Sequence, residues 1–151
     1  MRPEWKGRLI RIAVGLVLLA LVIYFYWPIS CADLLPKEGG VYVLVHLLGV
    51  RDGQAFVSTE FEGQIERDDP VYAQIVALFS EYTCHRSLVD GGKGNHWVKF
   101  FYDADYEGLA CLGTDTLQVN ETHYYVVYGK GRGQEMMDAL CEILQQSKEP
   151  A

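Results

Sequence analysis

Residues 129–133, Gly-Lys-Gly-Arg-Gly, combine the residue types of an anion site with a position just before a predicted helix. Glycines let a ligand approach the backbone, and the free N–H groups at a helix start attract negative charge. The spacing matches neither the dinucleotide fingerprint nor the phosphate loop, because Gln134 stands where the former needs glycine. We expect a solvated turn or, alternatively, a site for a small anion, a lipid headgroup or one of the protein's own carboxylates. The residues of that site would be Lys130, Gly131, Arg132 and Gly133.

Alternating carboxylates before a glycine imitate the start of a calcium loop. They are Asp103, Asp105 and Glu107, with Gly108 at the sixth position. Thr114 stands at the twelfth position, where calcium needs a bidentate glutamate. Because Asp and Gly also occur in turns between strands for conformational reasons, we expect a turn, with calcium as the alternative, and no resident metal or cofactor.

The four cysteines are Cys31, Cys84, Cys111 and Cys141, and no two of them form a C-x-x-C pair. A zinc or redox motif is therefore not indicated. Apolar neighbours of Cys111 and Cys141 favour buried free thiols. In an oxidising compartment a disulfide among Cys84, Cys111 and Cys141 is the alternative, with Cys31 set aside because it follows the apolar run so closely.

Cys84 and His85 are the nearest approach to a nucleophile and its base. Adjacent residues of a strand point to opposite faces, so these two cannot act on one another. A dyad of a cysteine with His46, His96 or His123 stays open. The sequence has no serine elbow and no His-Glu-x-x-His motif. We expect no catalytic activity, with an enzyme of unrecognised type as an alternative.

Residues 12–27 are all apolar, aromatic or glycine, and they follow four basic side chains in residues 1–11. An apolar helix of this length nearly spans the ~30 Å hydrocarbon layer, and Pro28 ends it. The residues expected at the membrane interface are Arg11, Tyr24, Tyr26 and Trp27. We predict an uncleaved signal anchor at 12–30. A cleaved signal peptide and a lipoprotein acylated at Cys31 are the alternatives.

The charges of the chain predict its orientation. The basic head keeps the N-terminus in the cytoplasm by the positive-inside bias, so the remainder of the chain would lie outside the cell membrane. The chain as a whole has a net charge of −7, and nearly all the acidic residues follow the anchor. Nucleic acid is therefore not an expected partner, because phosphate contacts need clustered Lys and Arg.

Hydrophobic periodicity and turn residues predict the elements that position these candidates. Strands are expected at 41–48, 54–61, 82–88, 97–102, 109–112, 116–119 and 123–128, and helices at 70–80 and 134–146. Asp52-Gly53 predicts a hairpin, and Asp69-Pro70 a capped helix start. The class is α+β, with a mostly antiparallel sheet covered by two helices on one face. The expected segments are a basic head at 1–11, the anchor at 12–30, a linker at 31–40, the domain at 41–147 and a tail at 148–151.

A short basic head, one anchor and a β-rich body resemble the organisation of small uncharacterised signal-anchored proteins of Gram-positive bacteria. The resemblance implies membrane attachment and no particular activity. We expect a non-catalytic module of the cell envelope that binds a protein partner or assembles with one. An exposed aromatic patch at Tyr124, Tyr125 and Tyr128 would serve that role. A sensor that uses the turn at 129–133 is the alternative.

Overall fold

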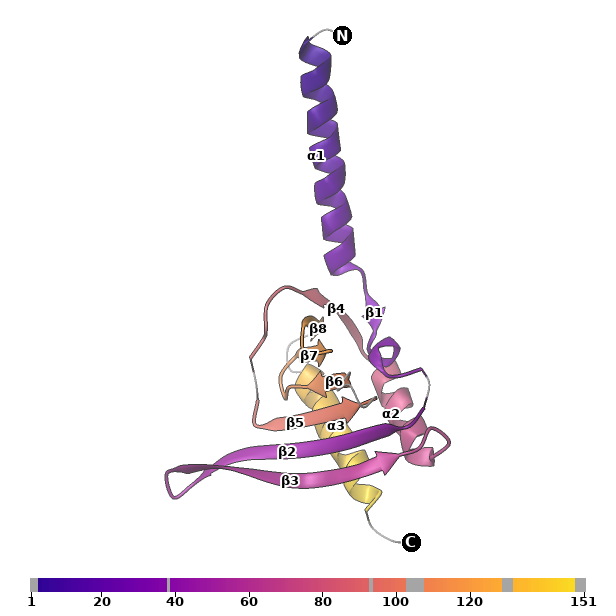
Figure 1. Cartoon of the computed structure of the whole chain (residues 1–151), viewed down its shortest axis with the longest axis vertical. Helices are drawn as coiled ribbons and strands as arrows, with labels where there is room; N and C mark the ends of the chain where they lie inside the picture. Colours follow the sequence, from indigo (N-terminus) through magenta and orange to yellow (C-terminus); the bar gives the residue numbers. More distant parts are fainter. Residues whose placement is uncertain (1–2, 38, 93, 103–107, 129–131, 149–151) are drawn as a thin grey trace.

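The computed structural model describes residues 3–37, 39–92, 94–102, 108–128 and 132–148. Its fold is α+β, as the sequence predicts: one apolar helix precedes an antiparallel sheet and two further helices (Figure 1). The helices are α1 (Pro3–Tyr26), α2 (Pro70–Ser80) and α3 (Arg132–Gln146), with a 3₁₀ helix η1 at Cys31–Leu34. The strands are β1 (Ile29–Ser30), β2 (Val41–Arg51), β3 (Gln54–Ile65), β4 (Thr83–Ser87), β5 (His96–Phe101), β6 (Gly108–Cys111), β7 (Thr116–Val119) and β8 (His123–Val127).

The described strands form one sheet in the order β1-β4-β8-β7-β6-β5-β2-β3. Every neighbouring pair is antiparallel, so the predicted pairing is confirmed. The long strand β3 and the two-residue strand β1 are the edges of this sheet. An edge strand has unpaired backbone groups along one side, which makes the edges relevant to binding.

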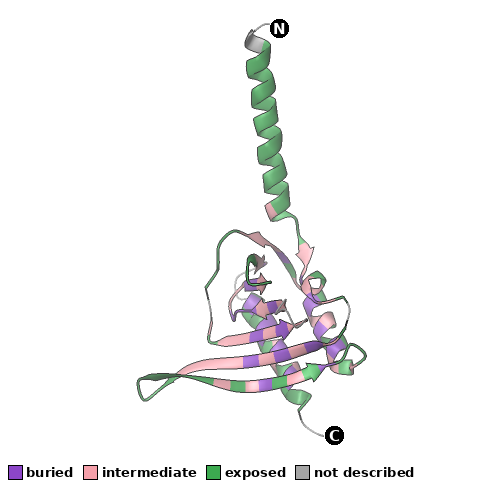
Figure 2. Ribbon diagram, viewed as in Figure 1, coloured by how far each residue is buried: buried purple, intermediate pink, exposed green. Residues whose placement is uncertain are grey.

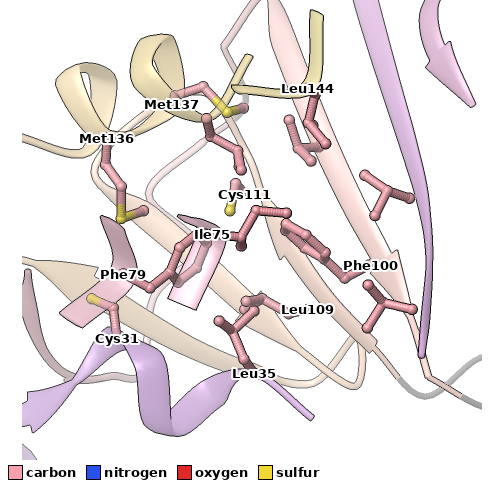
Figure 3. Close-up of a cluster of buried hydrophobic side chains, with 14 of the residues drawn as sticks. Cys31, Leu35, Ile75, Phe79, Phe100, Leu109, Cys111, Met136, Met137 and Leu144 are labelled. Carbon is pink, nitrogen blue, oxygen red and sulfur yellow. The ribbon is translucent and has the colours of Figure 1, made fainter. Parts of the chain in front are cut away.

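The core lies between one face of the sheet and the helices α2 and α3. Val41, Val43 and Val45 of β2 are buried alternately with less buried neighbours, as expected for a strand with one covered face. From the helices, Ile75 and Phe79 of α2 and several residues of α3 join the same cluster (Figure 3). The α3 members are Met136, Met137, Leu140 and Leu144.

Two local predictions are confirmed atom by atom. At the start of α2, the Asp69 carboxylate accepts a hydrogen bond from the Val71 N–H at 2.8 Å, and Pro70 occupies the first turn. Between β2 and β3, Asp52 and Gly53 have φ values of 54° and 77°. Two consecutive positive φ values define a type I′ turn, which matches the twist of the flanking strands.

Part of the segment 31–40, which the sequence predicts to be a linker, packs against the body. The Cys31 and Leu35 side chains are 0% and 4% exposed and pack in the core. The Tyr102 hydroxyl donates to the Leu34 carbonyl at 2.9 Å, and Tyr72 donates to Pro36 at 2.8 Å. Periodicity could not reveal this segment, because a two-residue strand and a single 3₁₀ turn are too short to show a repeat.

Helix α1 stands apart from the body and is exposed from Trp5 to Tyr24 (Figure 2). Among the described residues, Trp5–Tyr26 is the one stretch that is long and apolar enough to cross a membrane, with a mean hydropathy of 2.4 and no residue buried. Contact with the body is confined to its C-terminal end, beside β4.

Candidate functional site

The β2–β3 hairpin extends beyond the rest of the sheet. Register pairing of β2 with β5 ends at Leu47 and His96, with one further bond from the Leu48 N–H to the Asn95 carbonyl at 2.7 Å, whereas pairing of β2 with β3 continues to Arg51 and Gln54. We call residues 48–57 the arm. Figure 1 shows β2 and β3 at the end of the body remote from α1, with the arm projecting sideways. A two-stranded ribbon without sheet or helix behind it has little core of its own.

The arm carries exposed apolar side chains that no core requires. Val50 is 75% exposed, Val57 63% and Phe56 40%. The Phe56 ring lies across Gly49, where a Cβ would come within 2.6 Å of it. Gly49 and Phe56 are register partners, so the glycine makes room for the ring on this face. The arm thus presents exposed apolar side chains on both of its faces, Val50 and Val57 on one and Phe56 on the other.

The outer edge of β3 is protected in one half and open in the other. Glu60 has no register partner on β2, because the ladder shifts from Val45–Phe61 to His46–Thr59. Such a bulge interrupts further pairing. Lys148 donates to the Glu60 carbonyl, and its ammonium lies 5.2 Å from the Phe61 ring centroid. Nothing in the described part of the chain covers the edge from 54 to 58.

The body contacts the C-terminal end of α1 through side chains of β4 and of the residue after β8. The Arg86 guanidinium donates to the Tyr24 carbonyl at 3.0 Å and lies 4.4 Å from the Tyr24 ring centroid. The Tyr128 hydroxyl donates to the Tyr26 carbonyl at 3.3 Å, and the His85 ring contacts both Tyr26 and Tyr128. The last carbonyls of a helix lack partners within it, so these bonds cap α1 and orient the body beneath it.

A second exposed apolar site lies next to this junction. Leu88 is 80% exposed and Val89 70%. Leu88 lines a groove between α1 and β4 together with Leu21 and Val22. Beyond α1 and the adjoining Trp27, the large apolar side chains exposed among the described residues lie in this loop and in the arm.

The predicted anion site is partly visible. Lys130 and Gly131 lie outside the described residues, whereas Arg132 is exposed and Gly133 is buried at the start of α3. The Gly133 N–H donates to the Asp115 carboxylate at 2.8 Å, and a Cβ on Gly133 would lie 2.5 Å from the Asp115 Cα. A carboxylate of the protein itself therefore accepts from the backbone at the described start of α3, and the anion site stays a prediction.

The calcium and catalytic alternatives stay predictions for the described part of the chain. Asp103, Asp105 and Glu107 lie outside it. Within it, no group of three or more His, Cys, Asp or Glu residues could hold a metal ion. The histidines bond elsewhere: His46 faces Thr59, His96 faces Glu60, His123 faces Thr122, and His85 donates to the Arg86 carbonyl.

The cysteines are all free thiols, three of them buried and Cys141 half-buried. Burial raises the pKa of Cys111, and it raises the pKa of Cys141 to about 11. Neutral thiols are poor nucleophiles, so these two are chemically quiet at neutral pH. Cys84 lies beside Cys31, the cysteine set aside in the sequence-based pairing.

The expected tyrosine patch is not exposed. Tyr124, Tyr125 and Tyr128 are each half-buried; Tyr125 packs against the core and Tyr128 bonds to α1. The surface that the sequence missed is the arm, although a signal was present. Val50 and Val57 flank the Asp-Gly turn at positions where a solvated hairpin tip would carry polar residues.

The membrane-interface residues predicted from the sequence have two kinds of surroundings. All four are exposed, and of these Tyr24 and Tyr26 also contact the body. Comparison with known proteins adds no relative: no family model, curated protein or solved structure matches the chain.

Proposed function

We propose that this is a single-pass membrane protein whose α+β body lies outside the cytoplasm and binds a protein partner through the arm. The observation that carries the proposal is the exposure of Val50, Phe56 and Val57 on a hairpin that projects from the body. Exposed apolar residues gathered in one place mark interaction sites in proteins that are otherwise well folded. Binding, rather than catalysis, is the role we assign to the domain.

The exposure of α1 supports the membrane anchor. A 22-residue apolar helix with no buried residue would leave a large hydrophobic surface in water, whereas the bilayer interior covers it without cost. Lys6, Arg8 and Arg11 lie at its N-terminal end and favour the cytoplasmic side for that end. The body would then lie outside the cell membrane.

The contacts of the junction support an anchor that stays attached. Arg86 and Tyr128 bond to carbonyls of α1 that a cleaved chain would lack. Acylation of Cys31 would need an accessible sulfur atom, yet this side chain is 0% exposed. A retained signal anchor therefore accounts for the fold better than a lipoprotein does.

The exposed loop after β4 supports an orientation of the body close to the bilayer. Leu88 shares a groove with Leu21 and Val22, which belong to the apolar span of α1. We propose that Leu88 and Val89 contact the outer leaflet. The arm then lies on the far side of the body, where a soluble or membrane-bound partner can reach it.

The edge of β3 defines how the partner would bind. An extended segment can add a strand along 54–58, where the edge is open, and place apolar side chains against Val57 and Phe56. The bulge at Glu60 and the side chain of Lys148 limit the added strand to this half. A short partner strand anchored by apolar contacts is the occupant that these features fit.

Site-specific photo-crosslinking in intact cells tests the proposal. A photoreactive residue at Val57 should give one discrete crosslinked protein, identified by mass spectrometry, and the same residue at Gln145 on the exposed face of α3 should not. Val57→Asp should weaken capture from a second crosslinking position at Val50 at least tenfold, because burying an unpaired carboxylate is costly. Its melting temperature should stay unchanged, since Val57 packs against no core.

The same crosslinking experiment can overturn the proposal. Equal adducts at Val57 and Gln145, or undiminished capture in Val57→Asp, would exclude the arm as the binding surface. The extracytoplasmic location of the body is tested separately by protease treatment of intact cells, which should cut the body and spare α1. A body protected from protease until the membrane is permeabilised would contradict the extracytoplasmic location.

A further inference from the structure

The edge strand β1 brings Cys31 against Cys84. Ile29 pairs with Cys84 and Ser30 with Thr83, and the Cys31 N–H continues the ladder by donating to the Tyr82 carbonyl at 3.0 Å. Residues two apart on a strand share a face, so Cys31 lies on the same face as Ile29 and diagonal to Cys84. Both side chains are 0% exposed in the same core.

We propose that Cys31 and Cys84 are a disulfide-forming pair that fastens the chain leaving the membrane helix to strand β4. The bond would join two segments that are held by only two strand-register pairs. Oxidation in the cell rests on the extracytoplasmic location proposed above, because disulfides persist outside the reducing cytoplasm. The pairing itself rests on the fold alone.

The thiols of this pair already interact with one another. The Cys31 and Cys84 side chains hydrogen-bond, which lowers the pKa of Cys31 and raises that of Cys84. Cys31 is therefore the better nucleophile and reacts with the oxidant first. Cys84 reacts second and resolves the mixed disulfide. Among the described contacts, neither Cys111 nor Cys141 hydrogen-bonds to Cys31 or Cys84. Cys31 raises the pKa of Cys111 only through longer-range electrostatics.

The oxidation can be written with a low-molecular-weight disulfide, such as oxidised glutathione, as the oxidant. The Cys31 thiol loses its proton to water, and its sulfur attacks one sulfur of the oxidant, releasing the first thiolate. The Cys84 sulfur then loses its proton and attacks the Cys31 sulfur, releasing the second thiolate. The two released thiolates take up the two protons, and two electrons pass from the protein sulfurs to the oxidant.

The burial of both sulfurs determines when this exchange can occur. An oxidant reaches them during folding, or when the short edge strand β1 opens locally. Once formed, the bond is shielded, so reduction should be slow until the protein is denatured. The bridge would close the chain between residues 31 and 84, a long loop whose restriction stabilises a fold substantially.

The experiment uses the full chain in detergent micelles with a glutathione redox buffer, followed by denaturation and alkylation. We expect an intact mass lower by two hydrogens, two alkylatable thiols in place of four, and a proteolytic peptide pair linked through Cys31 and Cys84. Cys31→Ala and Cys84→Ala should each abolish the bridge. Cys141→Ala, which changes the half-buried thiol, should leave it intact. The bridged form should melt about 10 °C higher than the reduced form.

The outcomes separate the pairing from the location. Four free thiols after oxidation, or a linked peptide pair that contains Cys111 or Cys141, would overturn the pairing; because the wild-type chain is measured, an unfolded variant cannot obscure this result. Thiol trapping in intact cells is the second arm. A bridge with the defined oxidant but reduced thiols in cells would uphold the pairing and contradict the extracytoplasmic location.

Discussion

Single hydrogen bonds join segments that lie far apart in the sequence. Asp115 holds the start of α3 through the Gly133 amide, and Tyr102 holds η1 through the Leu34 carbonyl. A buried donor or acceptor that loses its hydrogen-bond partner lowers the stability of the fold by its full desolvation cost. Such bonds therefore hold a segment in one position. At this scale the protein is specified by a few side chains that reach across the fold.

Tyr102 gives a pH-dependent prediction. Burial raises the pKa of its phenol, so the folded protein keeps the proton to higher pH than the unfolded chain does. The stability that Tyr102 contributes is therefore present below pH 10 and declines as the pH rises above that value, where the unfolded phenol ionises. We expect Tyr102→Phe to cost about 1 kcal/mol at pH 8 and progressively less above pH 10. Chemical denaturation from pH 8 to pH 11 measures this, and a constant difference would contradict it.

The helix and strand boundaries are set by local chemistry that the sequence displays. Asp69 and Pro70 begin α2, and Asp52 with Gly53 reverses the chain between β2 and β3. In both places the required backbone conformation depends on one or two neighbouring residues, so residue type alone predicts the helix start and the turn. The arm shows the limit of this reasoning, since its strands were expected to be shorter than they are.

The helix cap can be tested against an adjacent matched control. Asp69→Ala removes the acceptor of the Val71 N–H and should lower the free energy of unfolding by about 1 kcal/mol. Asp68→Ala changes the neighbouring exposed carboxylate and should change it by less than about 0.5 kcal/mol. Equal effects of the two variants in urea unfolding would show that Asp69 acts through charge alone.

At the scale of the whole molecule, the described part of the body exposes large apolar side chains both in the loop after β4 and on the arm. Leu88 and Val89 lie beside α1, and Val50, Phe56 and Val57 lie on the remote arm. One site therefore faces the bilayer in the proposed orientation while the other is presented to a partner. The acidic body between them keeps the rest of the surface away from anionic lipid.

This orientation predicts different lipid contact at the two sites. Leu88→Trp in nanodiscs should be quenched by lipids brominated in the acyl chain, because the residue lies beside the apolar span of α1. Val57→Trp should not be quenched, since the arm is remote from the helix. The native tryptophans are replaced by Phe in both variants. Equal quenching at the two positions would contradict the orientation of the body.

The sequence by itself determined the apolar helix, the α+β class and nearly every strand and helix of the body. Hydrophobic periodicity, turn residues and caps act over a few neighbours, so they can be read along the chain. The start of α3 could likewise be predicted, but not the acceptor of its Gly133 N–H, because Asp115 reaches Gly133 only after the strands have paired.

Only the tertiary structure decided which distant residues meet. Three features depend on contacts between segments far apart in sequence: the junction of Arg86 with α1, the neighbouring thiols of Cys31 and Cys84, and the burial of Cys31 and Leu35 in the core. The projecting arm depends on where β5 stops pairing with β2. Such contacts follow from the order of strands in the sheet, and a single sequence carries no local signal of that order.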